Sequence, residues 1–186
     1  MKKLILSTLA LSLLTSSLLA KECINIKKVN VGWTSYKTMA KIGVSGFFKD
    51  VKLTTSKKHS DIKSALVGTT VQLNMANIDA KAAIKTSNIL KFFAPKLASQ
   101  TINATLVTMN EKSVDVKITL NGTTQTIPMN YTMDGGVIQA EGIIDARDFL
   151  MVDALKNLNT NVAGHKNKGW LDIAINFELL YEDSCK

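Results

Sequence analysis

Apolar and polar residues alternate with a period of two along most of the chain. The clearest stretch lies near the C-terminus, where the apolar phase comprises Leu171, Ile173, Ile175, Phe177, Leu179 and Tyr181. Successive side chains of a β-strand point to opposite faces, so each such stretch predicts a strand with one apolar and one polar face. The pattern therefore predicts an antiparallel sheet that buries one face and exposes the other.

Eight stretches of this kind predict eight strands. Their approximate bounds are Ile24–Tyr36, Gly43–Thr55, Ala65–Met75, Thr101–Met109, Lys112–Leu120, Gln125–Met133, Val137–Ile144 and Trp170–Tyr181. Asn121-Gly122 and Asp134-Gly135-Gly136 each separate two consecutive strands and are typical of tight hairpin turns. Long helices between the strands are missing from the pattern, which disfavours a parallel sheet. We therefore predict an all-β fold, an eight-stranded antiparallel barrel.

Two inserts break the alternation and predict one or two short helices. Ser87–Leu97 is rich in Ile, Leu and Phe and predicts a short helix or a lid. Asp148–Leu158 places apolar residues at three-residue spacing, which predicts a surface helix packed by one face.

The interior of the predicted barrel allows two interpretations. An eight-stranded barrel is either filled by its own side chains or just wide enough for one slim ligand. Small residues on the apolar phases, Ala104 and Gly142 among them, leave room, and Met129 is flexible enough to suit an adaptable wall. Small and large residues would also alternate in a filled, tapered core. The strand pattern by itself leaves both interpretations open.

The first twenty residues have the features of a secretory signal. Lys2 and Lys3 precede an apolar run from Leu4 to Leu14, and a small residue, Ala20, ends the segment. The run is too short for a membrane anchor. We predict that residues 1–20 are removed and that residues 21–186 form one domain, located in a bacterial periplasm or secreted.

Only two cysteines are present, Cys23 and Cys185, at opposite ends of the predicted mature chain. In an oxidising compartment an even number of cysteines indicates a disulfide. We predict one bridge between them that ties the two ends of the barrel chain together.

The chain is basic, with a formal net charge of +8 from 23 basic and 15 acidic residues. Lys2 and Lys3 belong to the predicted signal, and the remainder keeps a net charge of +6. This excess is compatible with transient contact with an anionic membrane surface. The lysines are spread singly on polar phases, and export fits nucleic-acid binding poorly, so we expect no nucleic-acid partner.

No pattern in the sequence is typical of an enzyme. His59 and His165 are the two histidines, and both lie in polar stretches. We find no Cys/His cluster with metal-ligand spacing, no glycine-rich phosphate loop and no serine in a nucleophile elbow. Asp145 and Asp148 are close in sequence, and we interpret them as helix caps. The prediction is a protein without catalytic residues, metal or cofactor.

Several segments together resemble the YceI-like family of secreted, lipocalin-like barrels. The stretch VGWTSYKTMAKIGVSGFFKDV, from Val31 to Val51, is similar to the opening signature of that family, and Val44, Gly46 and Phe48 match its spaced valine, glycine and phenylalanine. Later parts resemble the family in the same order: Ile78-Asp79, Phe92-Phe93, LNGTTQTIPMNYT from Leu120, GIIDARDFL from Gly142, and Gly169-Trp170 with Ile175 and Phe177.

The similarity is closest to a branch of the family with a tryptophan and a lysine in the first strand. Trp33 and Lys37 occupy those places here. An Arg-Asp pair that many members carry before the double phenylalanine is absent, and Lys85, Thr86, Ser87 and Asn88 lie near its place.

The resemblance implies a lipocalin-like barrel that carries or scavenges a long apolar chain. The implied ligand is a polyisoprenoid, an isoprenoid quinone or a fatty-acyl amide, bound without any further cofactor. A homodimer is compatible with the same resemblance. The alternative is a secreted barrel with a filled core that binds a protein or a membrane surface through its exposed face.

Strand phase and resemblance together nominate the ligand-contacting residues. Trp33 lies on the apolar phase of the first strand, and that phase puts Ser35 and Lys37 inward near the strand's end. Lys37 either meets a polar head group at the barrel mouth or is solvated. Phe92 and Phe93 either gate the mouth or cap one barrel end. The remaining candidates are inward positions of other strands, namely Phe48, Val116, Ile118, Met129, Tyr131, Ile173, Ile175 and Phe177.

Overall fold

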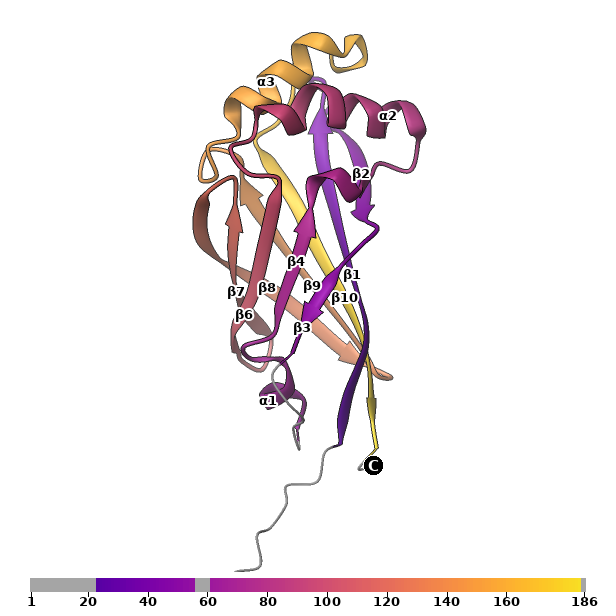
Figure 1. Cartoon of the computed structure of the whole chain (residues 1–186), viewed down its shortest axis with the longest axis vertical. Coiled ribbons are helices and arrows are strands. Elements are labelled where there is room, and N and C mark those ends of the chain that lie inside the picture. Colours follow the sequence, from indigo (N-terminus) through magenta and orange to yellow (C-terminus); the bar gives the residue numbers. More distant parts are fainter. Residues whose placement is uncertain (1–22, 56–60, 185–186) are drawn as a thin grey trace, which may run out of the picture.

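The structure, a computed structural model, describes residues 23–55 and 61–184. One curled antiparallel sheet forms a barrel and makes up most of this part of the chain (Figure 1). Its ten strands are β1 (Ile24–Lys37), β2 (Ile42–Phe48), β3 (Lys52–Thr54), β4 (Thr70–Asn74), β5 (Ile78–Asp79), β6 (Thr101–Met109), β7 (Ser113–Leu120), β8 (Thr123–Asp134), β9 (Val137–Asp145) and β10 (Asp172–Asp183).

The barrel is closed by two chain segments, one containing β2 and β3 and the other containing β4 and β5. Each segment contributes one strand near either end of the sheet. The strand order is β3-β4-β6-β7-β8-β9-β10-β1-β2-β5, in which β3 pairs with β4 and β5 pairs with β2. The chain runs from β2 to β3 through residues 49–51, and from β4 to β5 through the 3-10 turn Met75–Asn77. These two connections bring the ends of the sheet together. Two short ladders, with three and two residue pairs, thus close the barrel.

This closure explains why eight strands are predicted and ten are found. The predicted strand Gly43–Thr55 is interrupted after Phe48, and β5 is too short to show an alternation. The predicted strand Ala65–Met75 begins only at Thr70, because Ala65 and Leu66 belong to helix α1 (Ile62–Leu66). The other six strands agree with the prediction within two residues at each end, and the all-β antiparallel fold is confirmed.

Two bulges let apolar residues keep facing the interior. The pairing of β1 with β10 shifts register between Ile26 and Lys28, so that Lys27 is the extra residue. The pairing of β6 with β7 shifts in the same way between Leu106 and Thr108. A bulge also increases the local twist of its strand, which favours the curl of the sheet.

Helical segments cover one end of the barrel, and the short helix α1 lies at the other end (Figure 1). The covering segments are α2 (Ala83–Asn88), the π-helical turn η2 (Ile89–Phe93), the 3-10 turn η3 (Ala94–Lys96), α3 (Val152–Asn161) and the 3-10 turn η4 (Ala163–His165). The predicted insert Ser87–Leu97 is therefore helical, although helix begins four residues earlier. Phe93 is buried and Asn157 of α3 donates a hydrogen bond to the carbonyl of Phe92 at 2.5 Å, so this segment caps the barrel end.

The predicted capping role of Asp145 and Asp148 is wrong. Helix α3 begins at Val152, and its N-cap residue, Met151, makes no side-chain capping bond. The carboxylate of Asp145 instead accepts hydrogen bonds from the backbone N–H of Arg147 at 2.8 Å and from its guanidinium. This contact stabilises the turn that leads from β9 toward α3.

Asn121 joins three segments at the helical end of the barrel. It has the positive φ of 53° expected in the predicted Asn-Gly hairpin turn, and Gly122 follows with a φ of 79°. Its side chain is buried, and its Oδ1 accepts a bond from the N–H of Ala98 at 2.5 Å. Its Nδ2 donates to the carbonyls of Phe149 and Leu150 at 2.9 and 3.0 Å.

We expect Asn121→Ala to lower the free energy of unfolding by about 2 to 4 kcal/mol. It removes three hydrogen bonds, each worth about 1 kcal/mol net, and forces alanine into the left-handed region at a cost of roughly 1 kcal/mol. Asn121→Gly is the matched control, because it removes the same bonds without the backbone cost. Urea unfolding measures both. We call the three hydrogen bonds of the Asn121 side chain the Asn121 clamp. A change below about 0.5 kcal/mol for Asn121→Ala would show that this clamp does not stabilise the fold.

The predicted signal, residues 1–20, lies outside the described residues, as does Cys185. Across the ranges that are described, no helix has the length and apolar character needed to cross a membrane.

Candidate ligand-binding site

Two neighbouring apolar cavities lie inside the barrel. The larger has a volume of about 130 Å³, and the smaller a volume of about 70 Å³. They share two lining residues, Ala104 of β6 and Phe177 of β10, which mark the boundary between them.

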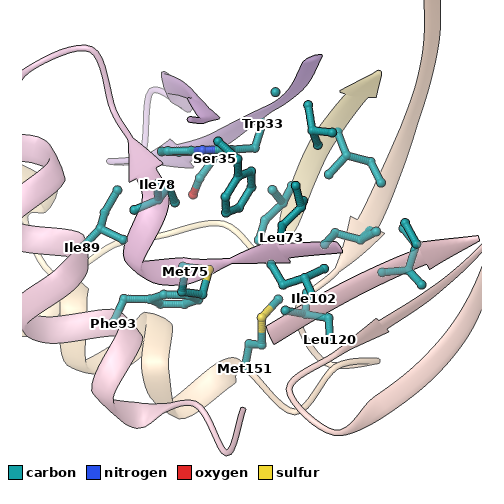
Figure 2. A pocket seen from close by; sticks show the side chains of 18 of the residues that line it. Trp33, Ser35, Leu73, Met75, Ile78, Ile89, Phe93, Ile102, Leu120 and Met151 are labelled. Carbon is teal, nitrogen blue, oxygen red and sulfur yellow. The ribbon is translucent and has the colours of Figure 1, made fainter. Parts of the chain in front are cut away.

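The larger cavity lies under the helical end of the barrel (Figure 2). Its wall combines residues of the strands with Met75 of the 3-10 turn Met75–Asn77 and with residues of η2, α3 and the turn before α3. The lining residues are Val31, Gly32, Trp33, Ser35, Phe48, Leu73, Met75, Ile78, Ile89, Phe93, Ile102, Ala104, Ile118, Leu120, Ile144, Met151, Leu155, Leu158, Ile173, Ile175 and Phe177.

The smaller cavity extends toward the opposite end, where Leu66 of α1 contributes to its wall. Thr69 is the polar residue of this wall, and its hydroxyl donates to the carbonyl of Ala65 at 3.0 Å. The wall is otherwise aliphatic or aromatic, apart from the sulfur of Met109. The two cavities together run along much of the barrel interior.

Large residues pair with small residues across the sheet beside the cavities. Phe177 on β10 lies opposite Ala140 on β9, and Ile175 lies opposite Gly142. A side chain at Gly142 would collide with Met129, because a Cβ there would lie 2.8 Å from Cγ of that residue. Ala140 lines the smaller cavity, whereas Gly142 lines neither cavity and the space beside it is filled by Met129.

The same arrangement positions the indole of Trp33. Trp33 on β1 lies opposite Gly46 on β2, and a Cβ at Gly46 would lie 2.5 and 2.7 Å from two carbons of the indole. The ring therefore packs directly against the backbone of Gly46. Its Nε1 is buried and has no hydrogen-bond partner among the described residues.

Charged groups lie outside the cavities. None of the residues that line either cavity is titratable. Ion pairs join Lys49 to Asp79 at 2.9 Å and Lys41 to Asp172 at 2.7 Å on the outer surface. The hydrogen bond from Lys49 is the main cause that lowers the pKa of Asp79. The interior is thus an apolar environment that suits an uncharged guest.

The predicted contact residues divide into those that line a cavity and those that do not. Most line the larger cavity: Trp33, Phe48, Phe93, Ile118, Ile173, Ile175 and Phe177. Val116 lines the smaller one. Met129, Tyr131, Phe92 and Lys37 line neither. The role of each in ligand binding stays a prediction.

The residues outside the cavities have other contacts. Met129 is fully buried in the core, and the hydroxyl of Tyr131 donates to the carbonyl of Asn110 at 2.8 Å. Nζ of Lys37 lies beside Gly164 of η4, and its charge, after burial, is the second cause that lowers the pKa of His165. Strand phase correctly places Trp33 and Ser35 at the cavity, whereas Lys37 is directed toward η4.

Several lining residues were not among the predicted contacts. Met151, Leu155 and Leu158 from the region of α3 belong to this group, and their spacing of four and three is a helical signal that was available in the sequence. Ile78 and Ile89 had no such signal, because short β5 and the π-helical turn have no regular period.

The described parts of the chain contain no group of three His, Cys, Asp or Glu side chains that could hold a metal ion.

Comparison with known proteins agrees with this architecture. The YceI-like domain family matches residues 24–179. None of the curated proteins matches the chain. Among solved structures, a polyisoprenoid-binding domain from Saccharophagus degradans implicated in plant cell wall breakdown is similar with a TM-score of 0.63 and 12% identity, covering 88% of this chain and 99% of the other.

Two further structures have the same fold. BcnA of Burkholderia cenocepacia aligns with a TM-score of 0.53 and 15% identity, over 83% of this chain and 98% of its own. A variant of the YceI protein of Campylobacter jejuni aligns with a TM-score of 0.52 and 14% identity, over 75% and 85%. The family match spans most of the chain and the barrel is the one that these proteins share, so this protein belongs to the YceI-like family.

Proposed function

We propose that this protein is a bacterial binding protein that holds one long-chain apolar ligand inside the barrel. The ligand is a polyisoprenoid, an isoprenoid quinone or a fatty-acyl amide, and its binding serves transport, storage or sequestration. The observation that carries the proposal is the pair of adjoining apolar cavities inside a closed sheet. A similar fold in a polyisoprenoid-binding domain supports it.

The chemistry of the wall suits this function. Burial of a hydrocarbon chain contributes about 0.8 kcal/mol per methylene, so a chain of moderate length binds tightly without charged contacts. The absence of titratable lining residues from both cavities agrees with a ligand held mainly by its apolar chain.

The size of the cavities requires the wall to adapt. The larger cavity is comparable to the engineered apolar cavity of about 150 Å³ that binds a single benzene ring. A long chain therefore has to pass Ala104 and Phe177 into the smaller cavity and displace flexible side chains. Met75 and Met151 lie on the wall and are suited to such movement, because the unbranched thioether has several low-energy conformations.

The proposal extends to location and partners. Residues 1–20 act as a cleaved signal, which places the protein in the periplasm or outside the cell. The protein performs no catalysis and needs no cofactor besides the bound lipid. It contacts an anionic membrane surface transiently, and a homodimer is compatible with the family.

Native mass spectrometry tests the proposal directly. The chain is expressed with its signal into a bacterial periplasm, purified without detergent, and analysed before and after organic extraction. We expect one hydrophobic adduct per chain, and the extract identifies its class. A clean ligand-free mass, together with no uptake of added prenols, quinones or acyl amides, would overturn the proposal and favour a protein- or membrane-binding surface.

A further inference from the structure

The wall of the larger cavity has two polar side-chain groups, and both belong to β1. Trp33 contributes an indole nitrogen and Ser35 a hydroxyl, whereas the other lining side chains carry only carbon, hydrogen and sulfur. Figure 2 shows the nitrogen of Trp33 and the oxygen of Ser35 among the drawn side chains. The two residues are two positions apart on one strand, so their side chains lie on the same face of the sheet. The polar part of the cavity is therefore confined to one place.

Nε1 of Trp33 is a buried hydrogen-bond donor without an acceptor. No described residue accepts a hydrogen bond from it. The other described tryptophan, Trp170, is half-buried and donates its Nε1 to the carbonyl of Thr38 at 2.8 Å. Buried indoles usually have such a partner. Because most buried donors in folded proteins have a partner, the exception at Trp33 indicates an acceptor other than the residues that the structure describes.

The position of this donor is fixed by the backbone. The indole packs against Gly46, where a Cβ would lie within 2.7 Å of two ring carbons and 2.2 Å of the carbonyl oxygen of Asp79. Gly46 is thus the residue that leaves room for the ring. An indole held in this way presents its N–H without having to be reoriented when a ligand arrives.

The acceptor has to be uncharged. No cationic side chain lines the cavity, and Nζ of Lys37, two residues beyond Ser35, is directed toward Gly164. A carboxylate or a phosphate buried beside Trp33 would have no counter-charge. A carbonyl oxygen is neutral, only accepts hydrogen bonds and has two lone pairs, which suits an indole N–H and a hydroxyl placed on one face.

We infer that the bound ligand carries a neutral carbonyl oxygen that accepts a hydrogen bond from Nε1 of Trp33, with the hydroxyl of Ser35 beside it and the apolar chain in the cavities. This inference rests on the proposed function and deepens it. It selects acyl amides and quinones over hydrocarbons, free fatty acids and prenyl phosphates. Trp33 thereby acts as the residue that determines specificity for the polar group.

The experiment compares two ligands that differ in one carbonyl group. The probes are 2-nonadecanone and nonadecane, and nonadecanoic acid serves as the anionic probe. Their relative affinities are measured by competition in native mass spectrometry. We expect the wild-type protein to prefer the ketone over the alkane by about tenfold and to bind the acid no better than the alkane. In Trp33→Phe the preference for the ketone should disappear.

Trp170→Phe is the matched control, because it removes an indole N–H that lies outside the cavity. It should keep the preference for the ketone. A second measurement needs no variant at the cavity: the indole 15N–1H resonance of Trp33, assigned by comparison with the Trp170→Phe protein, should move downfield with the ketone and not with the alkane. This measurement remains available if Trp33→Phe does not fold.

The outcomes separate the inference from the proposed function. If neither ketone nor alkane binds, the inference is overturned, and the uptake of prenols, quinones and acyl amides decides the proposed function separately. If the two bind equally to the wild type, or if the indole resonance does not respond to the ketone, the inference fails and the proposed function stands. If Trp33→Phe still preferred the ketone over the alkane, another residue would donate the hydrogen bond to the ketone. That result would overturn the role of Trp33.

Discussion

Ile118→Trp is expected to lower the affinity for a C20 prenol such as geranylgeraniol by about 100-fold. Ile118 lines the larger cavity and pairs across the sheet with Ala104, at the boundary between the two cavities. A bicyclic ring there occupies the space through which the chain passes. Exclusion of about four methylene groups from the cavity removes roughly 3 kcal/mol of binding free energy, which corresponds to the expected loss. Isothermal titration calorimetry measures the affinity.

Lys117→Trp is the matched control for this variant. Lys117 precedes Ile118 on β7 and is exposed on the outer face, so the same new side chain lies outside the barrel. Its affinity for the prenol should equal that of the wild type. Overpacking by Ile118→Trp is expected to cost about 1 to 3 kcal/mol of stability, so the thermal transition is recorded in parallel. Ile118→Phe provides a milder change. Wild-type affinity in a folded Ile118→Trp protein would show that the chain does not occupy this cavity.

Removal of the predicted disulfide should lower the free energy of unfolding by about 4 kcal/mol, because a long loop in the unfolded chain is no longer closed. The described residues around Cys23 are consistent with the bridge. Cys23 is buried, and its carbonyl accepts hydrogen bonds from the N–H and the hydroxyl of Ser184 at 2.8 and 3.2 Å. The residue after Ser184 is Cys185, which lies outside the described residues.

Urea unfolding of Cys23→Ser and Cys185→Ser measures this loss, and the two variants should be equally destabilised. Ser184→Ala is the control, because it removes a hydroxyl contact at the same place and leaves both cysteines. Thiol titration of the unfolded wild-type protein without reductant should find no free thiol. Two free thiols per chain would disprove the bridge, and the wild type would then unfold like the variants.

The strands were predictable because their pattern is local. In β10 every second residue from Ile173 to Tyr181 is apolar, and a period of two has no other common cause in so long a stretch. The turn at Asn121 and Gly122 was predictable for the same reason, since both residues take the positive φ that such a turn requires. The parts of the structure that were not predicted depend on contacts between residues distant in the sequence.

The closure of the barrel is one of these non-local features. β5 forms by pairing with β2, where Phe48 lies opposite Ile78, thirty residues further along the chain. The sequence around Ile78 shows no alternation that would predict a strand. The direction of Lys37 is another. Phase assigns it inward, but β1 ends at this residue and its side chain meets Gly164, which comes from the far end of the sequence. The hydrogen bonds of Asn121 to Ala98, Phe149 and Leu150 could not be predicted either, because these residues are distant from Asn121 in the sequence.

The wall of both cavities is free of titratable groups, and this determines which solution conditions can change ligand binding in them. The binding of a hydrocarbon chain in such an interior does not depend directly on buffer pH or on electrostatic screening by salt, since both act through charge. The fraction of the chain that is bound is set by a partition equilibrium between the barrel and other apolar phases, such as a bilayer, a micelle or a second barrel. Under the proposed function, loading and unloading follow the supply of competing apolar phases, and the amount of lipid around the protein sets the fraction of barrels that is filled.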